Sequence, residues 1–124
     1  MNIGEAARQC GLSAKTIRYY ESAGLVMPAT RRDNGYREYD SDQLRELVFV
    51  RHARQFGFSM DECKKLLGLL RNENRRSHDV HALVADKLAD IDQRINELLS
   101  MKKMLEEMSG QCPNDDNASC AIID

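Results

Sequence analysis

The sequence predicts a mainly α-helical protein, and three observations carry that prediction. Short apolar patterns with helical spacing, separated by glycines, recur through residues 1–75. From residue 77 onward a longer seam of apolar residues follows steps of three and four, which is typical of a coiled coil. Only residues 25–39 carry the features of a β-hairpin. We therefore expect a helical head with one hairpin, followed by one long helix and a short loop.

The first two helices are predicted to form a helix-turn-helix. Residues 3–10 place their apolar side chains on one helical face, and Gly11 is a natural stop after them. Ser13 offers an N-cap for a second helix over residues 14–23. Two short helices joined by a tight glycine-containing turn are an arrangement that DNA-reading proteins use.

The second helix has an apolar side and a polar side. Ile17 and Tyr20 would share the inner face of this helix. Their burial would leave Lys15, Arg18 and Tyr19 free to point outward. A basic and aromatic surface of this kind suits contact with a nucleic acid.

Residues 25–39 predict a β-hairpin wing, because Asn34-Gly35 is a strong two-residue turn signal with flanks rich in Arg and Tyr. A third helix follows, with Asp40 or Ser41 as its cap. The stretch Ser59-Met60-Asp61-Glu62 fits a capping box and opens a fourth helix. The head is therefore expected to contain four helices and one wing.

Composition and charge exclude several classes of protein. No apolar run approaches the roughly 18 residues of a membrane span, and the first residues lack the features of a signal peptide. We therefore expect a cytoplasmic protein without membrane contact, in which structural disulfides are rare. No nucleophile–base set, phosphate-binding loop or cofactor fingerprint occurs, so an enzyme is not expected. Although the net charge is −2, residues 1–57 carry nine Lys/Arg against seven Asp/Glu, which is compatible with a DNA-reading head.

The longest periodic stretch begins at Ser77. Its seam residues are Val84, Leu88, Ile91, Ile95, Leu98 and Leu105. A helix of about 30 residues spans roughly 45 Å, more than a head of this size can cover. Because one helix cannot bury its own stripe, we expect a homodimer joined along this seam. The predicted domains are the head at residues 1–75, the dimerisation helix at residues 76–109 and a loop with the carboxyl-terminal segment at residues 110–124.

Cys112 and Cys120 bracket seven small, polar or turn-forming residues after the long helix. Two thiolates are too few for a tetrahedral zinc site, which needs four ligands. They suit a soft monovalent ion such as Cu(I), which prefers thiolate sulfur. On spacing alone, a disulfide or two ordinary free cysteines remain open. The other two cysteines, Cys10 and Cys63, lie on apolar helix positions and are expected to be structural.

Three groups of motifs stand out along the chain. They are Ile17-Arg18-Tyr19-Tyr20-Glu21 with Gly24-Leu25, then Asn34-Gly35-Tyr36-Arg37-Glu38-Tyr39, and finally Arg54-Gln55-Phe56-Gly57-Phe58-Ser59. Together they strongly resemble the MerR family of transcription regulators, and most closely its copper-efflux branch, which senses monovalent coinage metals. The resemblance covers essentially the whole chain. It implies a winged helix-turn-helix head, a long antiparallel coiled-coil dimerisation helix and a C-terminal metal-binding loop.

The resemblance also implies roles for individual residues. The positions that match DNA contacts of the family are Lys15, Arg18 and Tyr19 at the major groove, Arg31, Tyr36 and Arg37 in the wing, and Arg54 at a further phosphate. Arginine can read guanine edges through two hydrogen bonds, while cations in a wing mainly add salt-dependent affinity for phosphates. Glu21, within the first motif, is expected to be a local structural partner rather than a DNA contact.

Cys112 and Cys120 match the two metal ligands of the copper sensors. The position that resembles a third ligand in divalent sensors of the family is Ser77, which we count as a selectivity residue rather than a ligand because it lacks a thiol. Two thiolates and one monovalent ion leave a net charge of −1, which backbone amides or a helix dipole can support. A divalent ion would neutralise the site and lose that match. We therefore expect Cu(I) as inducer, with Ag(I) and Au(I) as alternatives.

The sequence thus predicts a copper(I)-responsive activator of transcription. It is expected to bind promoter DNA as a homodimer, to distort that DNA on metal binding, and so to let RNA polymerase start at metal efflux and detoxification genes. One alternative is a redox-responsive regulator switched by a Cys112–Cys120 disulfide. Another is a copper buffer or chaperone, which leaves the helix-turn-helix and the wing without a role.

Overall fold

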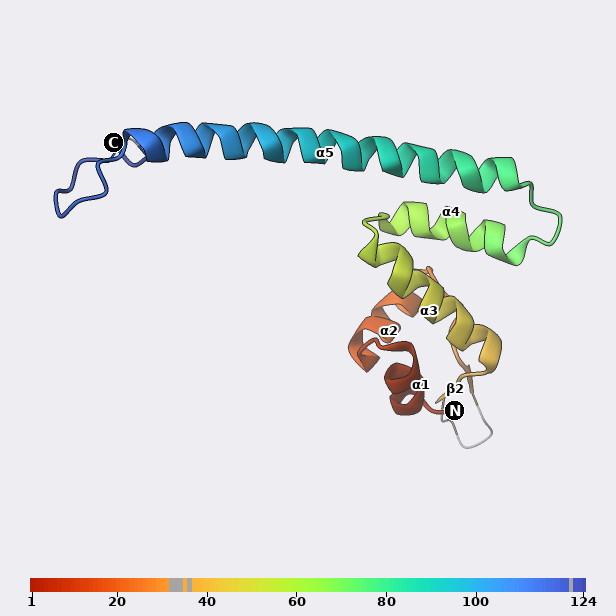
Figure 1. Cartoon of the computed structure of the whole chain (residues 1–124). Helices are drawn as coiled ribbons and strands as arrows, with labels where there is room; N and C mark the ends of the chain where they lie inside the picture. The colour runs from red at the N-terminus through yellow and green to blue at the C-terminus, as the bar shows by residue number, and fades with distance from the viewer. Residues whose placement is uncertain (32–34, 36, 121) are drawn as a thin grey trace. The chain divides into compact units, whose positions relative to one another are not determined.

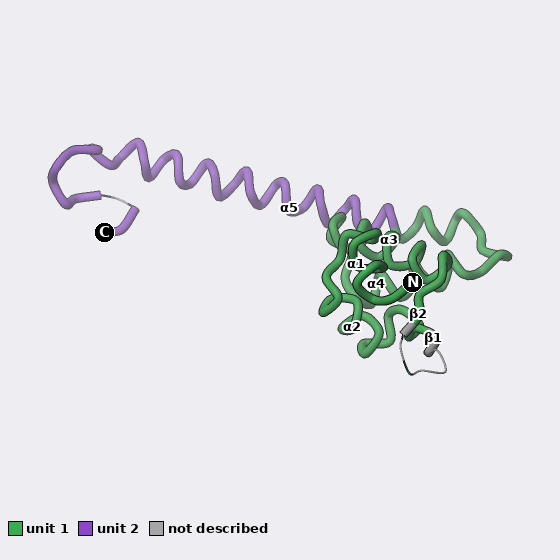
Figure 2. Tube along the Cα trace, turned by 90° about the horizontal axis from the view of Figure 1, so that it is seen from below, with its two compact units in different colours: residues 1–83 green, residues 84–124 purple. Residues whose placement is uncertain are grey.

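The computed structural model describes residues 1–31, 35, 37–120 and 122–124, and at residues 30, 31 and 37 it describes the backbone alone. The chain is mainly helical, as predicted, with helices α1 to α5 and strands β1 and β2 (Figure 1). It divides into two compact units, unit 1 at residues 1–83 and unit 2 at residues 84–124 (Figure 2). Among the described residues, none of the helices has the length and apolar character needed to cross a lipid bilayer.

Helices α1 (Ile3–Cys10) and α2 (Ala14–Ser22) form the predicted helix-turn-helix in unit 1. Asn2 and Ser13 cap them, because each side chain accepts a hydrogen bond from a backbone N–H group of the first helical turn. Gly11 ends α1 with a φ of 75°, a left-handed conformation that glycine adopts without a steric penalty. The turn therefore fixes the angle at which α2 packs against α1.

Strands β1 (Thr30–Arg31) and β2 (Arg37–Glu38) confirm the predicted hairpin. They pair in antiparallel fashion, with Thr30 opposite Glu38 and Arg31 opposite Arg37. Asn34 of the predicted turn lies outside the described residues. Strands of two residues contribute few ladder hydrogen bonds, so this wing depends on contacts at its base for its position.

Helices α3 (Ser41–Gln55) and α4 (Met60–Arg71) complete the head. Each begins with a capping box, formed by Asp40 with Gln43 in α3 and by the predicted pair Ser59 and Glu62 in α4. α3 packs against both α1 and α4. The two helices are thus bound to one another and to the helix-turn-helix.

A forked ion pair joins the far end of α4 to the first half of α3. Arg71, the last residue of α4, donates from Nε to Glu46 Oε1 at 2.5 Å and from Nη2 to Glu46 Oε2 at 2.9 Å. The hydrogen bond to Glu46 raises the pKa of Arg71 above its ordinary value. Two parallel bonds of this kind fix geometry as well as adding attraction.

The core of unit 1 lies among α1, α2, α3 and α4. Its fully buried aliphatic residues are Ile17, Leu25, Leu47, Val50 and Leu67. Cys10 and Cys63 are buried beside them, and their thiols lie 3.8 Å and 3.9 Å from the carbonyl oxygens of Ala7 and Phe58. The expectation that these two cysteines are structural is confirmed by their burial.

Helix α5 (Ser77–Gln111) contains 35 residues and differs from the sequence expectation at its end. The predicted dimerisation helix ended at residue 109, just before Gly110, whereas the helix continues to Gln111. Gly110 has no positive φ, so it stays helical. A glycine inside a helix costs only about 1 kcal/mol relative to alanine, which neighbouring turns can offset.

Alanine substitutions at two glycines, Gly11 and Gly24, distinguish the cost of backbone strain from the cost of a side-chain clash. Gly11 and Gly24 have similar positive φ values, 75° and 73°, but a Cβ at Gly11 would lie 2.7 Å from Nη1 of Arg51, whereas a Cβ at Gly24 would meet nothing within 4 Å. We expect Gly24→Ala to lower the free energy of unfolding by about 1–2 kcal/mol through strain. Gly11→Ala should lower it further, because the Arg51 side chain must also move.

Urea unfolding followed by circular dichroism measures both effects. In an Arg51→Ala background the two alanine substitutions should become equally destabilising. An equal cost in the wild-type background would contradict the packing of Arg51 over this turn.

Candidate metal loop and nucleic-acid interface

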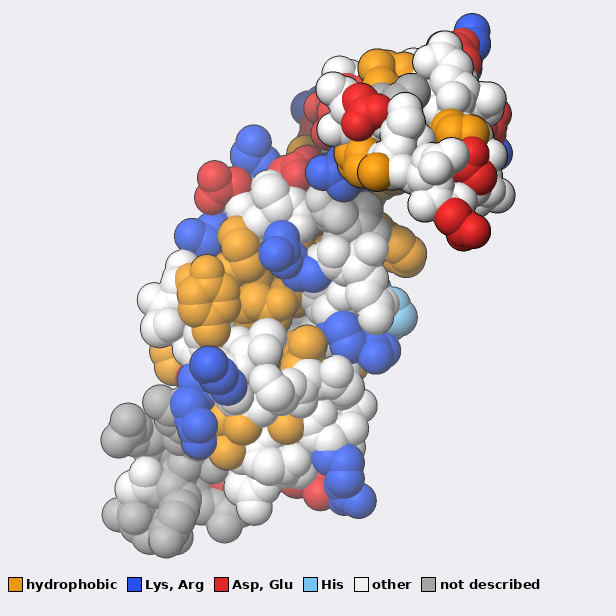
Figure 3. Space-filling view, turned by 90° about the vertical axis from the view of Figure 1, so that its left-hand side faces the viewer, with side chains coloured by type: hydrophobic (Ala, Val, Ile, Leu, Met, Phe, Trp, Pro, Cys, Tyr) orange, Lys and Arg blue, Asp and Glu red, His pale blue; other side chains and the backbone are white. Residues whose placement is uncertain are grey.

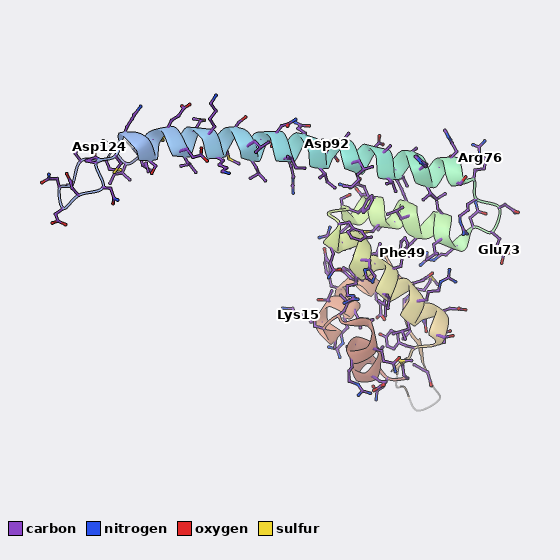
Figure 4. The ribbon with its side chains drawn as sticks, viewed as in Figure 1. Lys15, Phe49, Glu73, Arg76, Asp92 and Asp124 are labelled. Carbon is purple, nitrogen blue, oxygen red and sulfur yellow. The ribbon has the colours of Figure 1, made fainter. Side chains whose placement is uncertain are left out.

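Helix α2 presents one face to solvent and buries the other, as predicted. Ile17 is 0% and Tyr20 is 7% exposed, whereas Tyr19 is 57% exposed and Lys15 and Arg18 are exposed. Lys15 projects from α2 away from the other helices of unit 1 (Figure 4). The packing of the inner face therefore dictates which side chains a ligand can meet.

The exposed side of α2 combines charge with an aromatic ring. The ring of Tyr19 lies 6.0 Å from that of Tyr20, at an interplanar angle of 49°. Tilted aromatic pairs of this kind are attractive, so the buried Tyr20 supports the exposed ring of Tyr19. Figure 3 shows Lys and Arg side chains spread over one face of unit 1, several of them next to exposed hydrophobic side chains.

The predicted wing residues are only partly described. Arg31 and Arg37 stand opposite one another in the register of β1 and β2, and Tyr36 lies outside the described residues. The last predicted DNA contact, Arg54, is exposed near the end of α3, and its Nη1 donates to the carbonyl oxygen of Phe58 at 2.9 Å. Because a guanidinium carries five N–H donors, this bond leaves others for a phosphate.

The two predicted metal ligands lie in a loop that begins where α5 ends. The N–H of Cys112 still donates to the carbonyl oxygens of Met108 and Ser109, at 3.1 Å and 3.2 Å. At the other end of the loop, Asp124 Oδ2 accepts from the N–H of Cys120 at 3.0 Å and from the Ser119 hydroxyl at 3.3 Å. Both cysteines are thus held by backbone hydrogen bonds and are partly exposed.

The pKa values of the Cys112 and Cys120 thiols shift in opposite directions. Their mutual hydrogen bond raises the pKa of Cys112 and lowers the pKa of Cys120. Hydrogen bonds from the backbone of Ile122 and Ile123 lower the pKa of Cys120 further, whereas one from the backbone of Asn114 partly offsets the rise in the pKa of Cys112. Cys120 is therefore the thiol that ionises first, and backbone amides stabilise its negative charge.

The pair has no crosslink. Both cysteines are free thiols, so the structure gives no support to the disulfide alternative. Among the described residues, no group of three or more His, Cys, Asp and Glu side chains is arranged to hold a metal ion. Ser77 is exposed and is the first residue of α5, so the whole helix separates it along the chain from Cys112.

Sequence reasoning missed the hydrogen bonds that shape the loop. Asp115 accepts from the N–H of Asn117 at 2.9 Å, and Asn114 adopts a positive φ of 51°. Asp and Asn favour such local bonds and tolerate left-handed backbone, so their density after Cys112 was the available signal. No sequence signal indicated the role of Asp124, because its bonds to Ser119 and Cys120 depend on the path of the chain after the loop.

Helix α5 carries the predicted apolar seam on its surface. None of its described residues is buried, and the seam residues are 38–60% exposed: Val84, Leu88, Ile91, Ile95, Leu98 and Leu105. An exposed apolar stripe of this length is typical of an interaction surface. The chain therefore offers an interaction face along α5.

The chain matches two family descriptions. Residues 1–70 match the family described as MerR HTH family regulatory protein, and residues 44–108 match that described as MerR, DNA binding. Over 124 residues it is 46% identical to the HTH-type transcriptional regulator CueR of Salmonella typhi, covering 100% of this chain and 90% of that protein.

A second relative and a solved structure agree with these matches. The chain is 42% identical over 124 residues to heavy metal-dependent transcription regulator 2 of Rhizobium meliloti (strain 1021), covering 100% of this chain and 84% of that protein. The crystal structure of the transcription regulator PbrR691 from Ralstonia metallidurans CH34 in complex with lead(II) is similar, with a TM-score of 0.85 and 29% identity. The similarity covers 99% of this chain and 96% of that one.

The unequal thiols can be tested by their reactivity. Because only the thiolate is alkylated, we expect iodoacetamide to modify Cys120 at a lower pH than Cys112 as the pH is raised from neutral. Mass spectrometry of peptides from the metal-free, reduced protein measures the labelled fraction of each cysteine. Asp124→Asn keeps the loop length and serves as a control that should preserve the order. Labelling of Cys112 first would contradict the thiol–thiol hydrogen bond described above.

Proposed function

The chain belongs to the MerR family of helix-turn-helix regulatory proteins, and on that premise we propose that it is a Cu(I)-responsive activator of transcription. It is a DNA-binding regulator and not an enzyme. The observation that carries the proposal is the pair of free thiols, Cys112 and Cys120, in the loop after α5. In the proposed organisation the head reads DNA, α5 joins two chains and the loop senses the metal.

The loop fits a soft monovalent ion. Two free thiols in one short loop can both bind one ion, and Cu(I) prefers thiolate sulfur and accepts few ligands. The backbone N–H groups that lower the pKa of Cys120 support a site of net negative charge, as expected for two thiolates and one monovalent ion. When bound, the ion supplies two metal–sulfur bonds that tie Cys112 to Cys120.

Ag(I) and Au(I) share this chemistry and are the alternative inducers in the proposal. Both are soft monovalent ions, so the two thiols alone do not separate them from Cu(I). The resemblance to the copper-efflux branch favours Cu(I). The relatives named for heavy metals and lead(II) support a metal inducer in general.

The apolar seam of α5 supports a homodimer. A second copy of α5 carries a matching stripe, and pairing the two would remove both from water. In an antiparallel pair, the beginning of one α5 lies beside the end of the other. Such pairing would bring Ser77 of one chain toward the cysteine loop of its partner, where its lack of a thiol leaves the site with two ligands.

The exposed face of α2 supports promoter binding. Lys15, Arg18 and Tyr19 are placed on one side of a short helix, as a helix that enters a major groove requires. In the proposal the wing and Arg54 bind phosphates on either side of it. A homodimer would present two such heads to two half-sites of one promoter.

Activation follows the family pattern in this proposal. The metal-free dimer holds the promoter in a form that RNA polymerase uses poorly. Ordering of the two loops on metal binding changes how the two heads bind the DNA and so distorts the promoter. RNA polymerase can then initiate transcription of efflux and detoxification genes. Since the metal acts through the loop, loss of one thiol should separate sensing from DNA binding.

We expect Cys112→Ser to abolish transcription induced by Cu(I) while leaving DNA binding within about twofold, since the thiol lies outside the head. Transcription in vitro from a promoter bound by the wild-type protein measures induction, and electrophoretic mobility shift measures binding. Cys63→Ser offers a comparison at a buried structural thiol. Induction that survives in Cys112→Ser would show that the site is misplaced, and equal induction by Zn(II) at the same free-metal concentration would refute the charge argument.

Arg18→Ala tests the proposed DNA face. Loss of one guanidinium that contacts bases or phosphates should weaken operator binding by about tenfold or more. Titration of the reduced variant with Cu(I) under anaerobic conditions should give the same stoichiometry as the wild type. Arg8→Ala, at an exposed arginine of α1, is the matched charge control and should bind almost normally. An Arg18→Ala variant with wild-type operator affinity would contradict the assignment.

A further inference from the structure

A buried tyrosine links the wing to α2. Tyr39 is 2% exposed and follows directly after β2. Its hydroxyl donates to Glu21 Oε1 at 2.5 Å, and Glu21 lies in the last turn of α2. The expectation that Glu21 acts as a local structural partner is thereby confirmed. The bond joins two residues that are eighteen positions apart in sequence.

The backbone of Tyr39 is fixed from another side. Its N–H donates to the carbonyl oxygen of Met1 at 2.7 Å, and the Met1 ammonium donates to the carbonyl oxygen of Tyr39 at 2.8 Å (Figure 1 shows the amino end beside β2). The next residue, Asp40, caps α3. Tyr39 therefore lies where the wing, α1, α2 and α3 meet.

The wing needs such an anchor. β1 and β2 contain two residues each, too few for the ladder to orient the hairpin by itself. A hydrogen bond from a buried hydroxyl to a carboxylate is stronger than a bond between neutral groups. The contact between Tyr39 and Glu21 thus opposes rotation of the base of the wing relative to α2.

From this geometry we infer that Tyr39 and Glu21 are positioning residues for DNA recognition. They set the distance and angle between the wing and the outer face of α2, so that both can meet the same stretch of duplex. Neither residue needs to touch DNA for this role. The inference rests on the proposed DNA-binding function and adds to it the pair that determines preference for the correct site over other DNA.

The role predicts a loss of discrimination rather than a uniform loss of binding. With the hydroxyl removed, α2 and the wing can each still bind DNA but no longer engage one site together. Affinity for the correct site should then fall, while affinity for unrelated DNA should change little. A residue that only stabilises the head would leave the ratio of the two affinities unchanged.

Tyr39→Phe is the direct test, made on the full-length, metal-free protein. The probes are a duplex selected by the wild-type protein from a random-sequence pool and a scrambled duplex of equal length, both followed by fluorescence anisotropy over a range of KCl concentrations. We expect about tenfold weaker binding to the selected duplex and less than about twofold change on the scrambled one. The slope of log affinity against log salt on the selected duplex should also become shallower by about 0.9 for each phosphate that the wing no longer binds.

Two further variants make the result specific. Glu21→Gln keeps an acceptor for the hydroxyl and should show a smaller loss of affinity for the selected duplex. The double variant, Tyr39→Phe with Glu21→Gln, should bind that duplex no more weakly than Tyr39→Phe alone, because the two residues act as one unit. Arg71→Gln removes a forked carboxylate bond between α3 and α4 and is the control. It should lower the melting temperature without changing the ratio of affinities.

The outcomes are distinct. A Tyr39→Phe protein that folds and keeps the wild-type ratio and salt dependence would overturn the inference. If Tyr39→Phe fails to fold, an unchanged ratio in Glu21→Gln would overturn it instead. The proposed function is tested separately, by the wild-type protein alone. It would be rejected if the wild-type protein did not prefer any selected duplex over the scrambled one.

Discussion

Burial of one side of α2 is the constraint on which the rest of the head depends. Ile17 and Tyr20 can leave water only if α2 packs against α1 and the rest of the core, and this packing fixes the rotation of α2 about its own axis. Once that rotation is fixed, the side chains on the opposite face of α2 must point toward solvent. The surface proposed to read DNA is therefore a consequence of core packing, and its chemistry can be changed without disturbing the fold.

Much of this architecture could be predicted from the sequence, because local signals agree with tertiary packing. The caps at Ser13, Asp40 and Ser59, the stop at Gly11 and the seam of α5 each predict a feature that the structure contains. The end of α5 was predicted slightly too early from its glycine signal, because the cost of a helical glycine is small compared with that of ending a long helix. Local propensity sets preferences, and context decides between close alternatives.

The sequence indicated which residues make up the candidate sites, but not the contacts between them. Spacing singled out Cys112 and Cys120, yet it could not show that their pKa values shift in opposite directions or that backbone amides favour charge on Cys120. The bond between Tyr39 and Glu21 was equally hidden, because it depends on where the chain returns after the wing. Such contacts join residues far apart in sequence, for which a single chain offers no periodic signal.

The forked pair between Arg71 and Glu46 gives the head a mechanical property. α4 packs against α3, and at its end this fork joins it to α3 as well. α4 therefore cannot turn or slide along α3 without breaking charge-assisted bonds. Because the fork lies at the last residue of α4, where the chain leaves toward α5, a displacement of that end would act on α3 as well as on α4.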